Sequence, residues 1–285
     1  MKPAPFKYYA PRSVDEAVDL LGDLAPDDGR ILAGGQSLVP TMAFRMARPP
    51  HLIDINRITT LAGIDVDGKR IRIGACIRHA AFEEPARIPG PTGLLLSKVV
   101  HNIAHPPIRS RGTFCGSIAN ADPSSEWLCT AAALGAEVIA RSRRGERRIL
   151  AADFCKGVMT TDLQDDEMII AVELPLLPAG TRSGFVEFSR RKGDFAVAMV
   201  LVTYQVDRGH AADVRIAVGG VEHIPRRIAE AEALLAGAPA QKETFAAVAE
   251  AVADAIDPME DMQTAAEYRR SLTRTLTYRA LQSAA

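Results

Sequence analysis

The chain lacks three features that would have assigned it to common classes of protein. Its four cysteines, Cys76, Cys115, Cys129 and Cys155, stand far apart, and no C-x-x-C pair indicates a zinc or iron–sulfur site. No run of residues approaches the roughly 20 apolar residues of a membrane-spanning helix. The first residues also lack the apolar core of a secretory signal. The sequence therefore predicts a cytoplasmic protein whose thiols are reduced and buried.

The composition gives little support for nucleic acid, a membrane surface or a metal ion as a ligand. The 34 Lys and Arg residues are balanced by 35 Asp and Glu residues, so no overall positive field attracts a polyanion. The Arg-rich run at residues 141–148 has no interleaved aromatic side chains and is interpreted as a solvated hairpin turn. His101 and His105 have the spacing of metal ligands, but Pro106 ends their helix and no third ligand is evident. We predict no metal site.

The 285 residues are enough for two or three compact units, and segment 175–180 is the best linker between them. Two prolines and a glycine in this segment interrupt both helices and strand ladders. Before the linker, helical and strand patterns are interleaved. The expected elements there are a helix at 13–24, strands at 30–33 and 51–55, a hairpin at 64–75, a helix at 91–104, an irregular turn and strand at 112–118, a helix at 128–134, a hairpin at 137–150 and a strand at 168–174.

Beyond the linker, the pattern predicts a sheet followed by helices. Three strand-like runs, at residues 184–190, 196–206 and 213–218, would form an antiparallel sheet. Three amphipathic, Ala-rich helices are expected at 227–236, 242–255 and 264–282. The sequence thus predicts an α+β fold with its main boundary near residues 175–180.

A glycine pair follows a predicted buried strand near the N-terminus, in the order Ala33, Gly34, Gly35, Gln36 and Ser37. Glycines at such a place let consecutive backbone N–H groups converge without obstruction by side chains, and the resulting concavity suits a phosphate group. A tight turn without a ligand explains the pair equally well. The motif alone leaves both interpretations open.

A second glycine-containing turn makes a phosphate ligand more plausible. It runs from Gly112 to Ser117 and is followed by the polar segment 120–126. Two N–H-rich loops that close from opposite sides could fix the diphosphate of a dinucleotide without lysines. Neither loop reads G-x-G-x-x-G, so the sequence disfavours a Rossmann-type site.

With these motifs in view, the sequence resembles the FAD-binding medium subunits of carbon monoxide dehydrogenase and related molybdenum hydroxylases, which are similar to the flavin domain of xanthine dehydrogenase. The resemblance covers nearly the whole chain. The motifs that carry it occur in order at residues 8–13, 33–38, 52–55, 108–113, 119–123, 167–170 and 190–196.

The resemblance implies a fold and a cofactor site. Residues 1–176 would form a PCMH-type domain whose two small α/β subdomains, about 1–56 and 57–176, clasp FAD. Residues 181–285 would form the C-terminal domain, an antiparallel sheet with helices. By resemblance, the two loops hold the diphosphate, the acidic residues lie near sugar hydroxyls, and apolar residues pack on the flavin. The implied site residues are Leu32, Ala33, Gly34, Gly35, Gln36, Ser37, Leu38, Ile103, Ala104, Thr113, Cys115, Gly116, Ser117, Asn120, Asp122, Glu126, Ile169, Lys192 and Phe195.

The chain departs from the family pattern in its second loop. The usual motif is Thr-Ile-Gly-Gly-Ser, and Phe114 and Cys115 replace its Ile and its first Gly. A Cβ atom at Cys115 would be costly if the backbone there required a positive φ. Relatives also often carry a Lys in the strand before Arg190, where this chain has Val186, Glu187 and Phe188.

The resemblance implies an electron-transfer flavoprotein that binds FAD. No catalytic residue is expected in this chain, because the flavin ring performs the redox chemistry. Molybdopterin and the [2Fe-2S] clusters would be on a large and a small partner subunit, in a dimer of heterotrimers. Two alternatives are a self-contained FAD oxidase or reductase of the same wider fold, and a flavin-free scaffold subunit. The sequence indicates neither the substrate of the complex nor its final electron acceptor.

Overall fold

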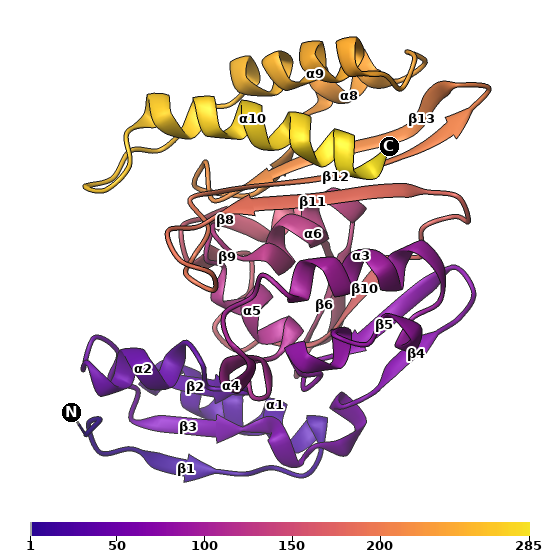
Figure 1. The fold of residues 1–285 in the computed structure, drawn as a ribbon. Helices are drawn as coiled ribbons and strands as arrows, with labels where there is room; N and C mark the ends of the chain where they lie inside the picture. The colour runs from indigo at the N-terminus through magenta and orange to yellow at the C-terminus, as the bar shows by residue number, and fades with distance from the viewer. Residues whose placement is uncertain (1) are drawn as a thin grey trace.

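Three main sheets follow one another along the chain in the computed structural model, which describes residues 2–285 (Figure 1). The first is parallel and has the order β1 (Lys7–Tyr9), β3 (His51–Asp54), β2 (Gly29–Leu32). Its helices are α1 (Val14–Leu24) and α2 (Leu38–Ala43). The strand predicted at 30–33 is therefore confirmed, and the glycine turn after it leads into α2.

Helix α1 begins where its capping residues predict. The Ser13 hydroxyl accepts a hydrogen bond from the Glu16 backbone N–H at 3.1 Å, and the Glu16 carboxylate accepts one from the Arg12 N–H at 2.7 Å. In a standard capping box, the Glu16 carboxylate would accept the N–H of Ser13 itself. Here it accepts the N–H of the preceding residue, Arg12, and so still satisfies a backbone donor at the start of the helix. Ala17, Val18 and Leu21 turn the apolar face of α1 into the core.

The second sheet is antiparallel and has the order β4 (Ile64–Val66), β5 (Arg70–Gly74), β10 (Met168–Pro175), β6 (Glu137–Ser142), β7 (Gly145–Leu150). Both predicted hairpins are confirmed. The remaining elements of this middle region are α3 (Gly90–Val100), α4 (Pro106–Arg109), α5 (Phe114–Asn120), α6 (Glu126–Leu134), α7 (Ala151–Phe154), β8 (Cys155–Gly157) and β9 (Thr160–Thr161). Short 3-10 turns lie at Ala25–Asp27, Ile55–Arg57, Thr59–Leu61, His79–Phe82 and Pro85–Arg87.

Two predictions for the middle region were wrong. The segment expected to be an irregular turn and strand at 112–118 forms helix α5, because Thr113 caps it: its hydroxyl accepts the Gly116 N–H at 3.0 Å. The left-handed conformation of Ala121 ends the same helix. Helix α3 ends at Val100, four residues before the expected end, and Ala104 has a φ of +40°.

The third sheet has the order β11 (Arg182–Phe188), β12 (Ala198–Asp207), β13 (His210–Gly219), β14 (Arg226–Arg227), all antiparallel. The three expected strands and the three expected helices are confirmed; β14 was not predicted. Helices α8 (Ala229–Leu235), α9 (Lys242–Ala255) and α10 (Ala266–Ala284) cover one face of this sheet, and α3 and α6 lie against the other (Figure 1). One apolar core lies under α8–α10, and a larger one continues through the rest of the chain.

The Arg-rich hairpin is more than a solvated turn. Arg141 pairs with Asp15 at 3.1 Å, and Arg143 pairs with Asp19 at 2.9 Å and Asp23 at 2.8 Å, so the β6–β7 hairpin is tied to helix α1. These side chains are partly exposed and each pair adds little stability by itself. Their arrangement nevertheless joins the first sheet region to the middle region. No helix among residues 2–285 has the length and apolar character needed to cross a membrane.

Candidate cofactor site

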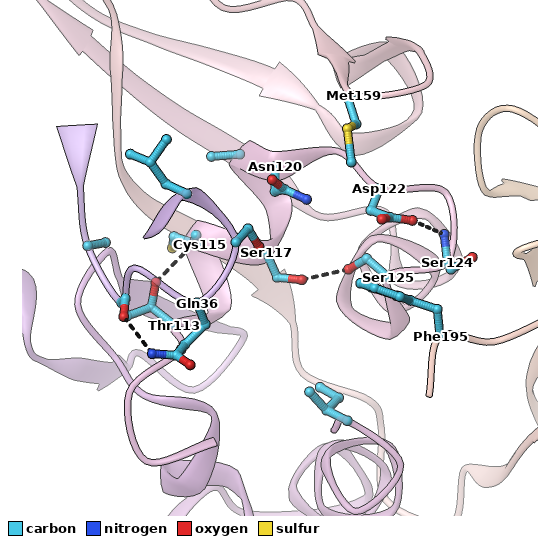
Figure 2. A pocket seen from close by; sticks show the side chains of 18 of the residues that line it. Gln36, Thr113, Cys115, Ser117, Asn120, Asp122, Ser124, Ser125, Met159 and Phe195 are labelled. Atoms are coloured by element: carbon cyan, nitrogen blue, oxygen red, sulfur yellow. Dashed lines mark hydrogen bonds between the residues drawn. The ribbon is translucent and has the colours of Figure 1, made fainter. Parts of the chain in front are cut away.

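A cavity of about 1130 Å³ lies where the three regions of the chain meet. Its walls come from the β2–α2 loop, helix α5 and its flanking loops, the start of β10, and the segment between β11 and β12. Of the residues implied by the resemblance, all but one line this cavity, and Figure 2 shows several of them facing the same space. The exception is Lys192, which is exposed and does not line it.

The two glycine loops meet backbone to backbone at one side of the cavity. A Cβ atom added to Gly34 would lie 2.4 Å from the Arg111 carbonyl oxygen and 2.7 Å from the Gly112 Cα atom, so only glycine fits. Gly35 has a φ of +70°, the left-handed region that glycine favours.

Free backbone donors face this part of the cavity. Among the described residues, the N–H groups of Gly35, Gln36, Ser37 and Cys115 have no hydrogen-bond acceptor. All four residues line the cavity. Clustered, unpaired N–H groups form a concavity suited to an anion such as a diphosphate.

Cys115 does not have the backbone conformation that would make its side chain costly. It lies in the first turn of α5 with a negative φ, is 2% exposed, and donates its S–H to the Ile73 carbonyl at 3.5 Å. Burial raises the pKa of its thiol. The condition for a penalty, a positive φ at this position, is therefore not met, and the thiol is kept in its protonated, unreactive form.

We predict that Cys115→Gly will not improve FAD binding. The glycine should cost about 2 kcal/mol of stability, because it lowers helix propensity and leaves a small cavity. Affinity should stay within about threefold of the wild type, since a helical residue needs no left-handed conformation. Fluorescence titration with FAD measures this, and Cys115→Ala, which keeps the Cβ atom, is the matched control. Markedly tighter binding by the glycine variant alone would contradict the assignment.

The polar wall of the cavity is held by hydrogen bonds within and beyond the α5–α6 loop (Figure 2). Ser117 and Ser125 join hydroxyl to hydroxyl at 2.7 Å, and Asp122 accepts the Ser124 N–H at 2.9 Å. The Ser124 hydroxyl donates to the Ala196 carbonyl at 3.0 Å, which ties this loop to the segment before β12. Asp122 is thereby fixed at the cavity with its other carboxylate oxygen available for a hydroxyl group.

The apolar wall is formed by Ile103, Ala104, Ile169 and Phe195. Phe195 is 73% exposed even though it lines the cavity, so its ring is available to cover a planar ligand. The segment that carries Phe195 approaches the turn after α3 closely, because a Cβ atom at Gly193 would lie 2.8 Å from the Ala104 carbonyl oxygen.

Sequence reasoning missed His79, which also lines the cavity. It is 6% exposed, and its Nδ1 accepts a hydrogen bond from the Trp127 Nε1–H at 2.9 Å. Burial, aided by the charges of Arg109 and Arg78, lowers the pKa of His79 to about 4. His79 is therefore neutral at physiological pH, with its proton on Nε2. Trp127 is fully buried and packs against both Phe82 and Phe114.

The pKa of His79 predicts a specific loss of stability in acid. The unfolded chain binds a proton at this imidazole near pH 6.5, whereas the folded chain binds it near pH 4. The stabilisation is complete above pH 6.5 and should be lost as the pH falls towards 4, by about 3 kcal/mol in all. Urea unfolding of wild type and His79→Gln, which keeps a side-chain acceptor, should show a flatter profile for the variant. The exposed His223→Gln is the control, and a variant profile as steep as the wild-type profile would contradict the assignment.

Residues from the C-terminal region complete the cavity and were also missed. They come from the loop before α10 and from α10 itself, namely Met259, Asp261, Gln263, Thr264 and Arg269. Arg269 is 4% exposed and donates to Asp261 at 2.5 Å. Only the fold brings these residues to the cavity, since they lie more than 130 residues from the second glycine loop. Within the described residues, no group of three or more His, Cys, Asp or Glu side chains could hold a metal ion.

Comparisons with known proteins agree with this geometry. Residues 4–177 match the family model described as the FAD binding domain in molybdopterin dehydrogenase, and residues 183–284 match the CO dehydrogenase flavoprotein C-terminal domain. The chain is 40% identical to the 6-hydroxypseudooxynicotine dehydrogenase complex subunit alpha of Paenarthrobacter nicotinovorans, over all of this chain and 96% of that one. It is 37% identical to the nicotine 6-hydroxylase medium subunit of the same organism, over all of this chain and 99% of that one.

A solved structure shares the whole fold. A chain of carbon monoxide dehydrogenase from Hydrogenophaga pseudoflava superimposes with a TM-score of 0.94 at 36% identity, covering all of this chain and 98% of that one. The chain therefore belongs to the FAD-binding medium subunits of the molybdenum hydroxylases, and it is a component of an oxidoreductase. The resemblance seen in the sequence is confirmed.

The residues of the cavity fit FAD, the cofactor of this family. Free N–H groups beside Gly34 suit the diphosphate, Asp122 offers an acceptor to a sugar hydroxyl, and an apolar wall with Phe195 suits a flat ring. When bound, the flavin supplies the redox chemistry, while the chain binds and orients it and limits its contact with water.

Proposed function

We propose that this chain is the electron-transfer subunit of a cytoplasmic molybdenum hydroxylase, and that its FAD passes electrons from an iron–sulfur partner to an external acceptor. The observation that carries the proposal is the cavity itself, which brings together unpaired N–H groups, a polar wall and an apolar wall, the surfaces that suit the diphosphate, the sugar hydroxyls and the flavin ring of FAD. Molybdopterin and two [2Fe-2S] clusters would be on a large and a small partner subunit, in a dimer of heterotrimers.

The chain's own residues would have three tasks in this proposal. The β2–α2 loop and the N-terminal turn of α5 would hold the diphosphate, with Gly34 allowing the two loops to approach. Ser117, Asn120, Asp122 and Glu126 would position the sugar hydroxyls. Ile103, Ala104, Ile169 and Phe195 would pack against the ring and shield it from water. Lys192 would contribute its positive charge from outside the cavity.

The site supports an electron-transfer role over that of a self-contained oxidase or reductase. Such an enzyme needs an acid or base positioned over the ring, and its pKa should be near the working pH. His79 lines the cavity, but its Nδ1 accepts the Trp127 N–H and burial lowers its pKa to about 4, so its imidazole is not suited to act as a base near neutral pH. The carboxyl of Glu126 belongs to the polar wall and would face the sugar hydroxyls in this proposal.

The electron route can be tested in the complex. The chain would be produced with its partner subunits, once as wild type and once as Gly34→Ala, in which FAD should be lost. With a panel of N-heterocycles and aldehydes, both complexes should show reduction of their iron–sulfur absorbance by the active substrate. Only the wild-type complex should then reduce NAD or a quinone. Equal acceptor reduction by the flavin-free complex would show that electrons bypass this subunit.

A further inference from the structure

Among the described residues, two interacting carboxyl groups have no basic partner: Glu126 at the polar wall of the cavity and the half-buried Glu187, which does not line it. Glu126 is the first residue of α6, is 9% exposed and lines the cavity. Glu187 is on β11 and does not line it, and its Oε2 atom is buried without a hydrogen bond. Among the described residues, neither forms a salt bridge, although most other buried acids of this chain do.

The surroundings of the pair disfavour two negative charges. Burial and mutual repulsion raise the pKa of Glu126, with a smaller contribution from Asp122, and burial raises the pKa of Glu187. The other titratable neighbour is the Cys129 thiol on α6, whose pKa is also raised by burial and by both carboxyls. Cys129 and Met199 pack around Gly219 here, so the neighbouring surface is apolar. The two carboxyls are therefore partly protonated near neutral pH, and their titrations depend on each other.

A negatively charged ligand in the same cavity changes the pKa values of Glu126 and Glu187. FAD carries two negative charges on its diphosphate, and the free N–H groups offset only part of them. The electrostatic effect is long-ranged where water is excluded. An anion in the cavity thus makes ionisation of the pair still less favourable.

We propose that Glu126 and Glu187 form a proton-accepting pair that takes up a proton when FAD binds, so that cofactor loading depends on pH. The inference rests on the proposed function, since it needs FAD in this cavity. The pair protonated in this way also offers a hydroxyl donor at the cavity wall, which an ionised carboxylate cannot do. No covalent bond changes: one proton moves from solvent to a carboxylate oxygen.

Calorimetric titration tests this coupling directly. FAD would be titrated into the flavin-depleted complex in buffers of different ionisation enthalpy, between pH 6 and pH 9. The slope of apparent binding enthalpy against buffer enthalpy should show uptake of a fraction of one proton per FAD. Affinity should weaken as the pH rises through the range in which the pair titrates, by at most about tenfold per pH unit, because a single proton is linked.

Glu187→Gln weakens the coupling without touching the cavity wall. The variant loses the repulsion that Glu187 exerts on Glu126, so the proton uptake should fall and move to lower pH, while the affinity at acid pH should stay close to that of the wild type. Glu243→Gln is the matched control, because Glu243 is exposed in the first turn of α9, far from the pair in the fold. This control should keep the wild-type proton uptake.

The outcomes separate the inference from the proposed function. FAD binding without proton uptake in the wild type, or equal uptake in wild type and Glu187→Gln, would overturn the inference and leave the proposed function intact. No FAD binding to the wild-type complex would overturn the proposed function. Infrared difference spectra of the wild type need no variant: they should show a gain of protonated carboxyl signal on FAD binding, and no gain would count against the pair.

Discussion

Replacing Gly34 by alanine should lower the affinity for FAD about a hundredfold or more while the chain remains folded. The added Cβ atom would lie 2.4 Å from the Arg111 carbonyl oxygen and 2.7 Å from the Gly112 Cα atom. Both are backbone atoms and cannot rotate away, so the two loops must separate. Loss of even two hydrogen bonds to a charged group, at about 1.5–3 kcal/mol each, gives an effect of this size.

The matched control is Gly63→Ala. The nearest atom to its added Cβ is an Asp65 carboxylate oxygen at 3.7 Å, an ordinary contact, so this variant should bind FAD like the wild type. Circular dichroism and urea unfolding would confirm that both variants are folded, and equilibrium dialysis with FAD would give the affinities. Wild-type affinity in Gly34→Ala would show that the diphosphate is not held where the two loops meet.

The second large effect is expected from Arg269, which joins three segments of the C-terminal region. Its guanidinium donates to the Val197 carbonyl at 2.6 Å, to the Gly220 carbonyl at 2.5 Å and to the Asp261 carboxylate at 2.5 Å. Asp261 is half-exposed and keeps the N–H donors of Gln263 and Thr264, so the main loss is of the two bonds from the buried guanidinium to carbonyl groups. Hydrogen bonds to a charged group contribute about 1.5–3 kcal/mol each, so Arg269→Met should destabilise the chain by about 3–5 kcal/mol.

The same change should also loosen the cavity, because Val197 and Asp261 both line it. Urea unfolding gives the loss of stability, and FAD titration of the folded variant should show a several-fold weaker affinity. Arg274→Met is the control on the same helix: its exposed pair with Glu250 at 3.1 Å should contribute less than about 1 kcal/mol. Similar losses for the two variants would show that the Arg269 contacts do not stabilise the fold as described.

Much of the fold was predictable because the deciding interactions are local. Ser13 and Glu16 mark the start of α1 within four residues, and a continuous apolar run marks β12 of the C-terminal sheet. Helix α5 was missed because Phe114 and Ile118 favour a strand, whereas the cap that determines the structure is a single Thr113 hydroxyl. Short helices depend on such caps more than on propensity.

Site residues could be predicted where a short motif fixes the backbone conformation of a loop. They could not be predicted where a side chain depends on hydrogen-bond partners that are distant in the sequence. Gly34 and Gly35 mark their loop because few other residues fit there. His79 and Trp127 are 48 residues apart, and the Arg269 contacts reach Val197 and Gly220 across the C-terminal region. Contacts between residues so far apart leave no pattern in the local amino-acid sequence. Lys192, inferred from a motif, is exposed and does not line the cavity, although the next residue, Gly193, does.

The central claim is that this chain supplies FAD to a complex whose metals are on other subunits. The most direct measurement is the absorption spectrum and metal content of the chain co-purified with its partner subunits, followed by identification of the cofactor released from each separated subunit after denaturation. The account predicts noncovalent FAD released from this chain, with iron and molybdenum confined to the partners. A complex that holds iron and molybdenum but no flavin would contradict it.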